Sequence, residues 1–100
     1  MIKRKLLGQH FLNSQNIAKS IITEAKITKK DVVFELGTGL GVLTPLLCEQ
    51  AKKVISVDAD EKLVRSAKSK FSKIDNLVLK SGDGFMTQDT FSIFVSNLPY

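Results

Sequence analysis

The 100-residue sequence contains a single cysteine, Cys48, and a single histidine, His10. One cysteine cannot form a disulfide within the chain, and His10 has no second ligand at a spacing that would hold zinc. We therefore expect no metal site, a reducing compartment and a small buried side chain at Cys48. No apolar run approaches the about 20 residues of a membrane span, and the lysine-rich start lacks the apolar stretch of a signal peptide. We expect a cytoplasmic protein without membrane contact.

The chain also lacks internal repeats, low-complexity runs and an obvious linker, which indicates one small folded domain. Its 15 lysine and arginine residues outnumber 10 acidic residues and give a net charge of +5. A basic surface favours a polyanionic partner such as a nucleic acid, although many basic proteins bind no polyanion. Charge alone therefore leaves the partner open.

Three alternating glycines, Gly37, Gly39 and Gly41, are the clearest signal in the chain. Residues 32–36 before them are apolar except for Glu35, which suits a buried parallel strand. The glycines allow positive φ and remove the Cβ atoms that would keep a ligand away from the backbone. Apolar residues at helical spacing follow, with a proline in the first turn, where it costs no hydrogen bond. The pattern predicts a strand, a turn and a helix, with free N–H groups facing a ligand above the turn.

The spacing of these glycines argues against a dinucleotide site. The turn has the pattern Gly-x-Gly-x-Gly, whereas the dinucleotide fingerprint places its third glycine one position later. An acid inside the strand just before the turn, here Glu35, is more typical of S-adenosylmethionine sites, whose ligand carries no phosphate. We therefore favour S-adenosylmethionine over NAD. A glycine turn with a purely structural role stays open as an alternative.

An acidic residue also follows the second predicted strand, residues 53–57. Asp58 lies about twenty residues beyond Gly37, and a carboxylate at that position can accept both hydroxyl groups of an adenosine ribose. Its alternative role is that of an acid at a helix N-terminus, which Asp60 or Glu61 would fill better. We therefore predict that Asp58 binds ribose.

A third strand is predicted at residues 77–79 and a fourth at residues 91–96. Asp83 follows the third strand, where it can accept the adenine amino group or form a simple Asp-Gly turn. The fourth strand leads directly into residues 97–100. Strands that alternate with helices predict an α/β fold, with a parallel sheet, helices on both faces and ligands at the carboxyl ends of the strands.

Two further helices complete the pattern. Ser14 is a suitable N-cap for a helix that ends near Lys26. Apolar residues at positions 63, 64, 67 and 71 mark a later helix, whose other face is strongly basic. A solvated lysine face is favoured here over an RNA-contacting one. The basic residues are Lys62, Arg65, Lys68, Lys70 and Lys73.

Residues 97–100 have the sequence Asn-Leu-Pro-Tyr, the catalytic tetrapeptide pattern of amino-methyltransferases. Other motifs precede it in order: GQHFL at 8–12, ELGTGLG at 35–41, VDAD at 57–60 and GD at 82–83. With these motifs the chain resembles the ribosomal RNA adenine N(6)-dimethyltransferases along its whole length. Leucine at position 98 favours the housekeeping small-subunit branch, because the related antibiotic-resistance methylases more often carry isoleucine there.

The resemblance implies a Rossmann-like, S-adenosylmethionine-dependent methyltransferase fold and a role for each matching residue. His10 and Leu12 would line the methionine part of the cofactor, and Gly37 and Gly39 would lie beneath it. The ribose would be held at Asp58 and the adenine at Asp83. The implied cofactor-binding residues are His10, Leu12, Glu35, Gly37, Gly39, Asp58, Asp83 and Asn97.

The tetrapeptide carries the implied catalytic residues, Asn97, Leu98, Pro99 and Tyr100. An adenine exocyclic amine is a poor nucleophile because its lone pair is delocalised into the ring. The Asn97 side-chain oxygen and the Leu98 carbonyl would accept its two N–H groups, and Pro99 would fix the turn that aims this carbonyl. Tyr100 would stack on the extruded base. Two rounds on one nitrogen would give dimethyladenine.

The resemblance also divides the chain into an N-terminal arm and helix, residues 1–30, and cofactor-binding βα units, residues 31–100. Relatives of this kind continue with further strands and a helical RNA-binding domain, so we expect a fold truncated after its fourth strand. Phe91 and Phe94 would then lie at an open apolar edge that favours aggregation. We expect a monomer that acts on ribosomal RNA of the small subunit, with weak or no activity in this chain alone. The alternatives are a non-catalytic RNA-binding or ribosome-assembly module and a resistance-type large-subunit methyltransferase.

Overall fold

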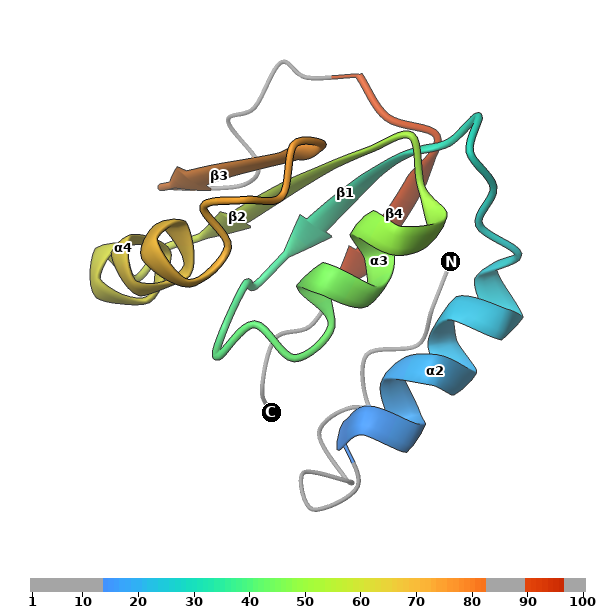
Figure 1. Cartoon of the computed structure of the whole chain (residues 1–100), viewed down its shortest axis with the longest axis horizontal. Helices are drawn as coiled ribbons and strands as arrows, with labels where there is room; N and C mark the ends of the chain where they lie inside the picture. Colours follow the sequence, from blue (N-terminus) through green and yellow to red (C-terminus); the bar gives the residue numbers. More distant parts are fainter. Residues whose placement is uncertain (1–13, 83–89, 97–100) are drawn as a thin grey trace.

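The computed structural model describes residues 14–82 and 90–96. A sheet of four parallel strands forms its centre (Figure 1), with the order β3-β2-β1-β4. The strands are β1 (Val32–Leu36), β2 (Lys53–Asp58), β3 (Leu77–Ser81) and β4 (Ile93–Ser96). The helices are α2 (Ser14–Ala25), α3 (Thr44–Gln50) and α4 (Glu61–Lys70). The predicted alternation of strands and helices in a parallel sheet is therefore confirmed.

The strand register brings the carboxyl ends of the strands into one row. Leu36 at the end of β1 is aligned with Val57 of β2 and with Ser96 of β4. On the other side of β2, Asp58 is aligned with Ser81. Segments that are far apart in the sequence therefore leave the sheet at the same edge.

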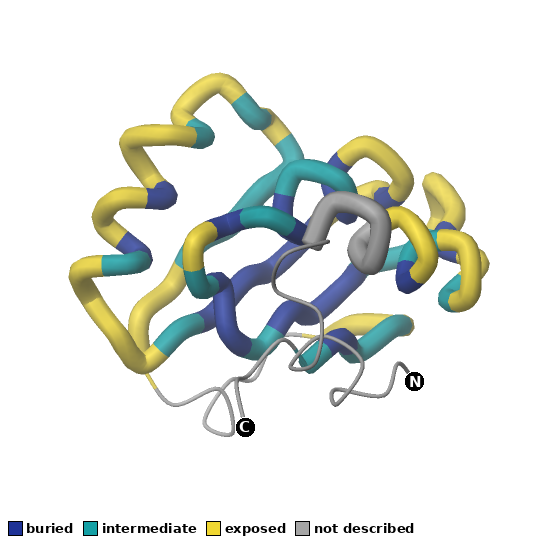
Figure 2. The backbone as a smooth tube through the Cα atoms, turned by 90° about the horizontal axis from the view of Figure 1, so that it is seen from below, coloured by how far each residue is buried: buried dark blue, intermediate teal, exposed yellow. Residues whose placement is uncertain are grey.

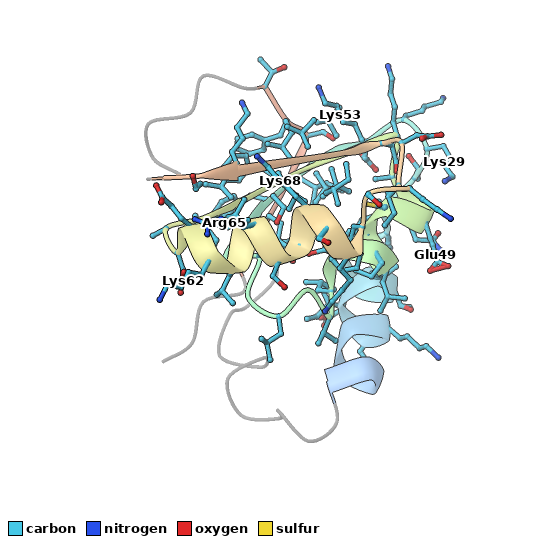
Figure 3. The ribbon with its side chains drawn as sticks, turned by 60° about the vertical axis from the view of Figure 1, so that its left-hand side comes forward. Lys29, Glu49, Lys53, Lys62, Arg65 and Lys68 are labelled. Carbon is cyan, nitrogen blue, oxygen red and sulfur yellow. The ribbon has the colours of Figure 1, made fainter. Side chains whose placement is uncertain are left out.

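All three helices lie against one face of the sheet (Figures 1 and 3). For α3 and α4 this follows from the topology: β1, β2 and β3 step across the sheet in one direction, and right-handed crossovers in one direction place their helices on the same side. Val33 and Val54 point to this face and pack with Leu47 of α3 and Ile21 of α2, and each of these side chains is at most 1% exposed. The core of the described structure lies here.

The opposite face of the sheet carries a second apolar cluster built around Phe34, Ile55 and Val57. In residues 14–82 and 90–96 no helix lies against this face. Figure 2 shows that the central strands β1 and β2 are nevertheless mostly buried, whereas β3 and β4 are mostly intermediate or exposed. Cover by helices on one face is thus observed, and helical cover of the second face stays a prediction.

Local sequence chemistry accounts for the starts of α3 and α4. Proline lies in the first turn of α3, as expected. At α4 the Asp60 side chain caps the helix by accepting from the backbone N–H groups of Lys62 and Leu63. Glu61 adds a negative charge to the first turn, so the predicted helix N-terminal role of these two acids is confirmed.

Cys48 lies on the buried side of α3. Its surroundings are apolar, and burial raises the pKa of its thiol to about 12. The thiol is therefore inert at neutral pH, and the prediction of a small buried side chain is confirmed.

The fourth strand begins at Ile93 and not, as predicted, at Phe91. The side chain of Ser92 donates to Asp31 and accepts from the backbone N–H of Val32, and these bonds hold the chain at the start of the pairing with β1. The ring of Phe91 is 45% exposed, with its centroid 5.3 Å from that of Phe34. β4 is an edge strand among the described strands, as expected; aggregation through this edge stays a prediction.

The chain leaves α2 through Lys26, which has a φ of 52°. This left-handed conformation is common just after a helix but is usually taken by glycine or asparagine.

In the described ranges, no helix combines the length and the apolar character required to cross a membrane.

Candidate functional site

The glycine turn after β1 is bonded directly to the end of β2. The N–H of Gly37 donates to the carbonyl of Val57 at 2.7 Å, and the N–H of Gly39 donates to Asp58 Oδ2 at 2.9 Å. The N–H of Gly82, just beyond β3, donates to the carbonyl of Asp58 at 3.0 Å. Three strand ends therefore meet around Asp58, as the sequence predicts for a ligand site at this edge.

The three glycines have positive φ, as predicted, with values of 97° at Gly37, 57° at Gly39 and 82° at Gly41. The prediction of free N–H groups is wrong for these residues. Gly37 and Gly39 bond to β2, and the N–H of Gly41 donates to the carbonyl of Thr38 at 3.0 Å. The turn needs these internal bonds because glycine gives the backbone little conformational restraint. A pyrophosphate group would find no unused glycine N–H in this turn, which argues further against the dinucleotide alternative.

The glycines serve different purposes. A Cβ atom at Gly39 would meet nothing within 4 Å, so the backbone there faces open space that a ligand can occupy. A Cβ atom at Gly41 would lie 2.7 Å from Cε2 of Phe71. Gly41 is therefore needed for packing against α4, while the open face of Gly39 is available to a ligand.

Asp58 is half-buried beside this open face. Its Oδ2 accepts from Gly39, and its Oδ1 accepts from the backbone N–H of Asp60 at 2.9 Å. A carboxylate has about four acceptor positions, so each oxygen can accept one more bond. The geometry thus leaves room for two ligand hydroxyl groups, and the ribose role of Asp58 stays a prediction.

A buried polar network lies beneath the turn. Glu35 of β1 is 0% exposed, and its Oε1 accepts from the hydroxyl groups of Thr44 at 2.6 Å and Ser56 at 2.7 Å. Ser56 is also 2.5 Å from the hydroxyl of Thr38, which belongs to the turn itself. The four side chains connect β1, β2, the glycine turn and the start of α3.

The donors in this network can be assigned. Ser56 donates its hydrogen to Glu35, so the bond between Ser56 and Thr38 must take its hydrogen from Thr38. The bonds therefore run from the turn through Ser56 to the carboxyl group. Among the described residues, no group bonds Oε2 of Glu35. Burial raises the pKa of Glu35 to about 7, more than its two hydroxyl donors lower it.

Glu35 was expected to bind the cofactor, and the structure places it below the turn rather than at its open face. Its position can support the turn through Thr38 and Ser56. Direct contact with a cofactor stays a prediction for this residue. In the described part of the chain, no group of three histidine, cysteine or acidic side chains could hold a metal ion.

The remaining predicted site residues lie outside the described residues. β4 ends at Ser96, aligned with Leu36 immediately before Gly37, so the described part of β4 ends at the site edge. The residues concerned are His10, Leu12, Asp83, Asn97, Leu98, Pro99 and Tyr100.

A family model for ribosomal RNA adenine dimethylases matches residues 2–100 of this chain. The chain belongs to the ribosomal RNA adenine dimethylase family. This result confirms the resemblance inferred from the motifs and supports the assignment of an enzyme fold.

Two relatives show how much of a family protein is present. The chain is 39% identical over 100 residues to a probable ribosomal RNA small subunit methyltransferase A of Methanosarcina barkeri, covering 99% of this chain and 35% of the relative. It is 41% identical over 97 residues to the ribosomal RNA small subunit methyltransferase A of Dehalococcoides mccartyi, covering 97% of this chain and 33% of the relative. The chain thus spans about a third of the length of these relatives.

Two solved structures of proteins with similar sequences have the same fold. A dimethyladenosine transferase from Plasmodium falciparum superposes with a TM-score of 0.76 at 36% identity, over 85% of this chain and 32% of that protein. The 23S rRNA methyltransferase ErmE superposes with a TM-score of 0.71 at 27% identity, over 100% of this chain and 37% of that protein. The Rossmann-like methyltransferase fold is therefore confirmed.

Sequence reasoning missed the hydroxyl groups of Thr38, Thr44 and Ser56. A signal for Ser56 was present, because one polar residue interrupts the apolar strand before Asp58. Thr44 could have been noted as a hydroxyl at a helix start, near an acid of the preceding strand. No local pattern could have paired these residues with Glu35.

Proposed function

We propose that this chain provides the cofactor-binding part of an S-adenosylmethionine-dependent enzyme that dimethylates adenine amino groups of small-subunit ribosomal RNA. The observation that carries the proposal is the open backbone face of Gly39 beside the Asp58 carboxylate. A flat adenosine group can lie on a surface without Cβ atoms while a carboxylate accepts its ribose hydroxyls. Within the proposal, residues 31–100 form the cofactor-binding βα units, and residues 1–30 form the N-terminal arm and helix.

The internal hydrogen bonds of the turn support a cofactor without phosphate. The N–H groups of Gly37, Gly39 and Gly41 are all bonded within the protein, so these three groups are not available to a phosphate. When bound, S-adenosylmethionine supplies an activated methyl group on its sulfonium. Gly39 and Asp58 would orient the adenosine part, and the buried Glu35 network would hold the turn below it.

The acceptor of the methyl group follows from the family. Asn97 and Leu98 would accept the two N–H groups of the target amine, and Tyr100 would stack on the base. The similarity to relatives named small subunit methyltransferase A, at 39% and 41% identity, supports small-subunit ribosomal RNA as substrate. We also propose a cytoplasmic monomer without a metal ion.

A second candidate is methylation of large-subunit ribosomal RNA. It is favoured by the superposition on the 23S rRNA methyltransferase ErmE, but the identity of 27% is lower than that to the small-subunit relatives. Incubation of the chain with radiolabelled S-adenosylmethionine and purified small or large subunits would separate the two. We expect little transfer from this chain alone; any transfer confined to large subunits would favour the second candidate.

The test of the cofactor site is calorimetric titration with S-adenosylmethionine. Asp58→Asn keeps the shape of the side chain but removes its charge and one acceptor, so we expect about tenfold weaker binding. Asp75→Asn is the matched control, because Asp75 is an exposed acid. Equal affinity of wild type and Asp58→Asn would contradict the assigned role of Asp58.

A ligand series separates ribose contact from loss of the turn bond. S-adenosylhomocysteine and its 2′-deoxy and 3′-deoxy analogues would be titrated into the wild type and Asp58→Asn. If Asp58 binds the hydroxyl groups, their removal weakens binding to the wild type but has little further effect on the variant. Equal losses in both proteins would show that Asp58 acts only by holding Gly39.

A further inference from the structure

The end of α4 packs against the second half of the glycine turn. Phe71 is the C-cap residue of α4, and its backbone N–H donates to the carbonyl of Ala67 at 2.8 Å. A Cβ atom at Gly41 would lie 2.7 Å and 2.8 Å from two carbons of the Phe71 ring. The edge of this ring is therefore in close contact with the turn backbone, across thirty residues of sequence.

Lys70 makes a second contact from the same helix end. Its Nζ donates to the carbonyl of Leu40 at 3.1 Å and lies 5.5 Å from the centroid of the Phe71 ring. The lysine thus bonds to the turn while it is placed over the ring that packs on Gly41. The two residues form a single support, which we call the α4 clamp (Lys70 and Phe71).

The turn needs a support at this point. Its first half is bonded to β2 through Gly37 and Gly39. Leu40, in the second half, is 77% exposed, so its side chain contributes little packing that would hold the turn. In the described part of the chain, the Gly41 N–H bonds to Thr38, and the α4 clamp adds the bond to the Leu40 carbonyl and the packing of Phe71 against Gly41.

We propose that the α4 clamp positions the glycine turn for the cofactor, so that Lys70 and Phe71 are positioning residues although neither lies at a strand end. The proposal rests on the proposed function, because it concerns affinity for S-adenosylmethionine. A turn with three glycines can adopt many backbone conformations, and the clamp restricts residues 40 and 41. The open face of Gly39 is then held ready before the ligand arrives.

A matched pair of lysines allows a specific test. Lys68 precedes Lys70 by two positions, which places it on the other side of the helix, and Figure 3 shows it on α4, away from the turn. Lys68 and Lys70 are both exposed, but only Lys70 bonds to the turn. Lys70→Met and Lys68→Met therefore remove the same charge, and only the first removes a turn contact. Lys70→Arg is the conservative variant that can restore the bond.

Two readouts distinguish positioning from general stability. Amide hydrogen exchange of residues 38–43 reports on the turn without any ligand, and we expect Lys70→Met and Phe71→Leu to accelerate it about fivefold. Titration with S-adenosylmethionine should show about three- to tenfold weaker binding for the same variants. Lys68→Met and Lys70→Arg should stay within about twofold of the wild type in both measurements. The unfolding temperature of Lys70→Met should match that of Lys68→Met.

The outcomes are distinct. Unchanged exchange in Lys70→Met and Phe71→Leu would overturn the proposal, whether or not the cofactor binds. Accelerated exchange without weaker binding would also overturn it, because the clamp would then not affect the cofactor. If the wild type binds no cofactor, the proposed function fails, and the exchange data still decide whether the clamp holds the turn. Should Phe71→Leu not fold, Lys70→Met alone carries the test.

Discussion

Replacement of Gly41 by alanine tests the packing of the glycine turn directly. The new methyl group would lie 2.7 Å from Cε2 of Phe71, in a backbone with a φ of 82°. A left-handed conformation costs an L-residue about 1–2 kcal/mol, and an overpacked contact costs about 1–3 kcal/mol more. We therefore expect Gly41→Ala to lower the free energy of unfolding by about 2–5 kcal/mol.

Gly39→Ala is the matched comparison. Its φ is 57°, and its added methyl group would meet no atom within 4 Å, so only the conformational cost applies. Alanine also reduces the entropy of the unfolded chain, which offsets part of this cost, and we expect a loss of about 1 kcal/mol. The two variants should differ by several degrees in unfolding temperature, because about 1 kcal/mol corresponds to about 4–8 °C in a domain of this size.

Cofactor binding should rank the same two variants in the opposite order. The methyl group of Gly39→Ala projects into the open face that we assign to the adenosine part. Gly39→Ala should therefore bind S-adenosylmethionine more weakly than Gly41→Ala, although it is the more stable of the two variants. Urea unfolding and calorimetric titration of both proteins check the two rankings.

A double variant isolates the contact with Phe71. Phe71→Leu removes the ring that Gly41→Ala would strike, so the two losses in stability should sum to more than the loss in the double variant. The conformational cost at position 41 would remain. Additive losses, or equal stability of Gly39→Ala and Gly41→Ala, would refute the assignment of Gly41 to packing.

Three further predictions concern stability. The pKa of Glu35 rises from 4.5 to about 7 in the native state, which therefore holds this proton more tightly than the unfolded chain. The wild type should lose on the order of 3 kcal/mol as pH rises from about 4.5 to about 7. Urea unfolding at both ends of this range should show that Glu35→Gln removes the dependence, whereas exposed Glu49→Gln keeps it. Lys26→Gly should raise the free energy of unfolding by about 0.5–1 kcal/mol, because glycine tolerates the φ of 52°; no gain in a thermal melt would contradict this. Asn76→Ala should cost about 1–2 kcal/mol in urea unfolding, because the Asn76 amide donates to two carbonyls at the end of α3.

The parts of the fold that depend on local chemistry could be predicted from the sequence. A strand before glycines, a proline in the first turn of α3 and an acid capping α4 each follow from a few adjacent residues. Asp58 could be placed at the site because parallel strands bring their carboxyl ends together. The start of β4 was predicted two residues too early, since the apolar character of Phe91 hides the role of the Ser92 hydroxyl.

The contacts that decide the shape of the site could not be predicted in this way. The sequence shows three glycines, but not that one faces open space and another faces Phe71. It shows an acid before the turn, but not that a serine 21 positions later donates to it. The sequence suggests free N–H groups at the turn. In the structure the N–H groups of Gly37 and Gly39 donate to β2, and that of Gly41 donates to a carbonyl within the turn itself. Neither kind of acceptor can be recognised from a local pattern.

The turn therefore depends on one βαβ unit as a whole. Its first half is bonded to Val57 and Asp58 at the end of β2, and its second half is held by Lys70 and Phe71 at the end of α4. β2 and α4 are consecutive in the sequence, so the short connection between them fixes where both sets of contacts lie relative to the turn. A substitution between β2 and β3 can consequently alter the proposed cofactor site without touching a glycine. The glycines permit the conformation of the turn, and the following strand and helix select it.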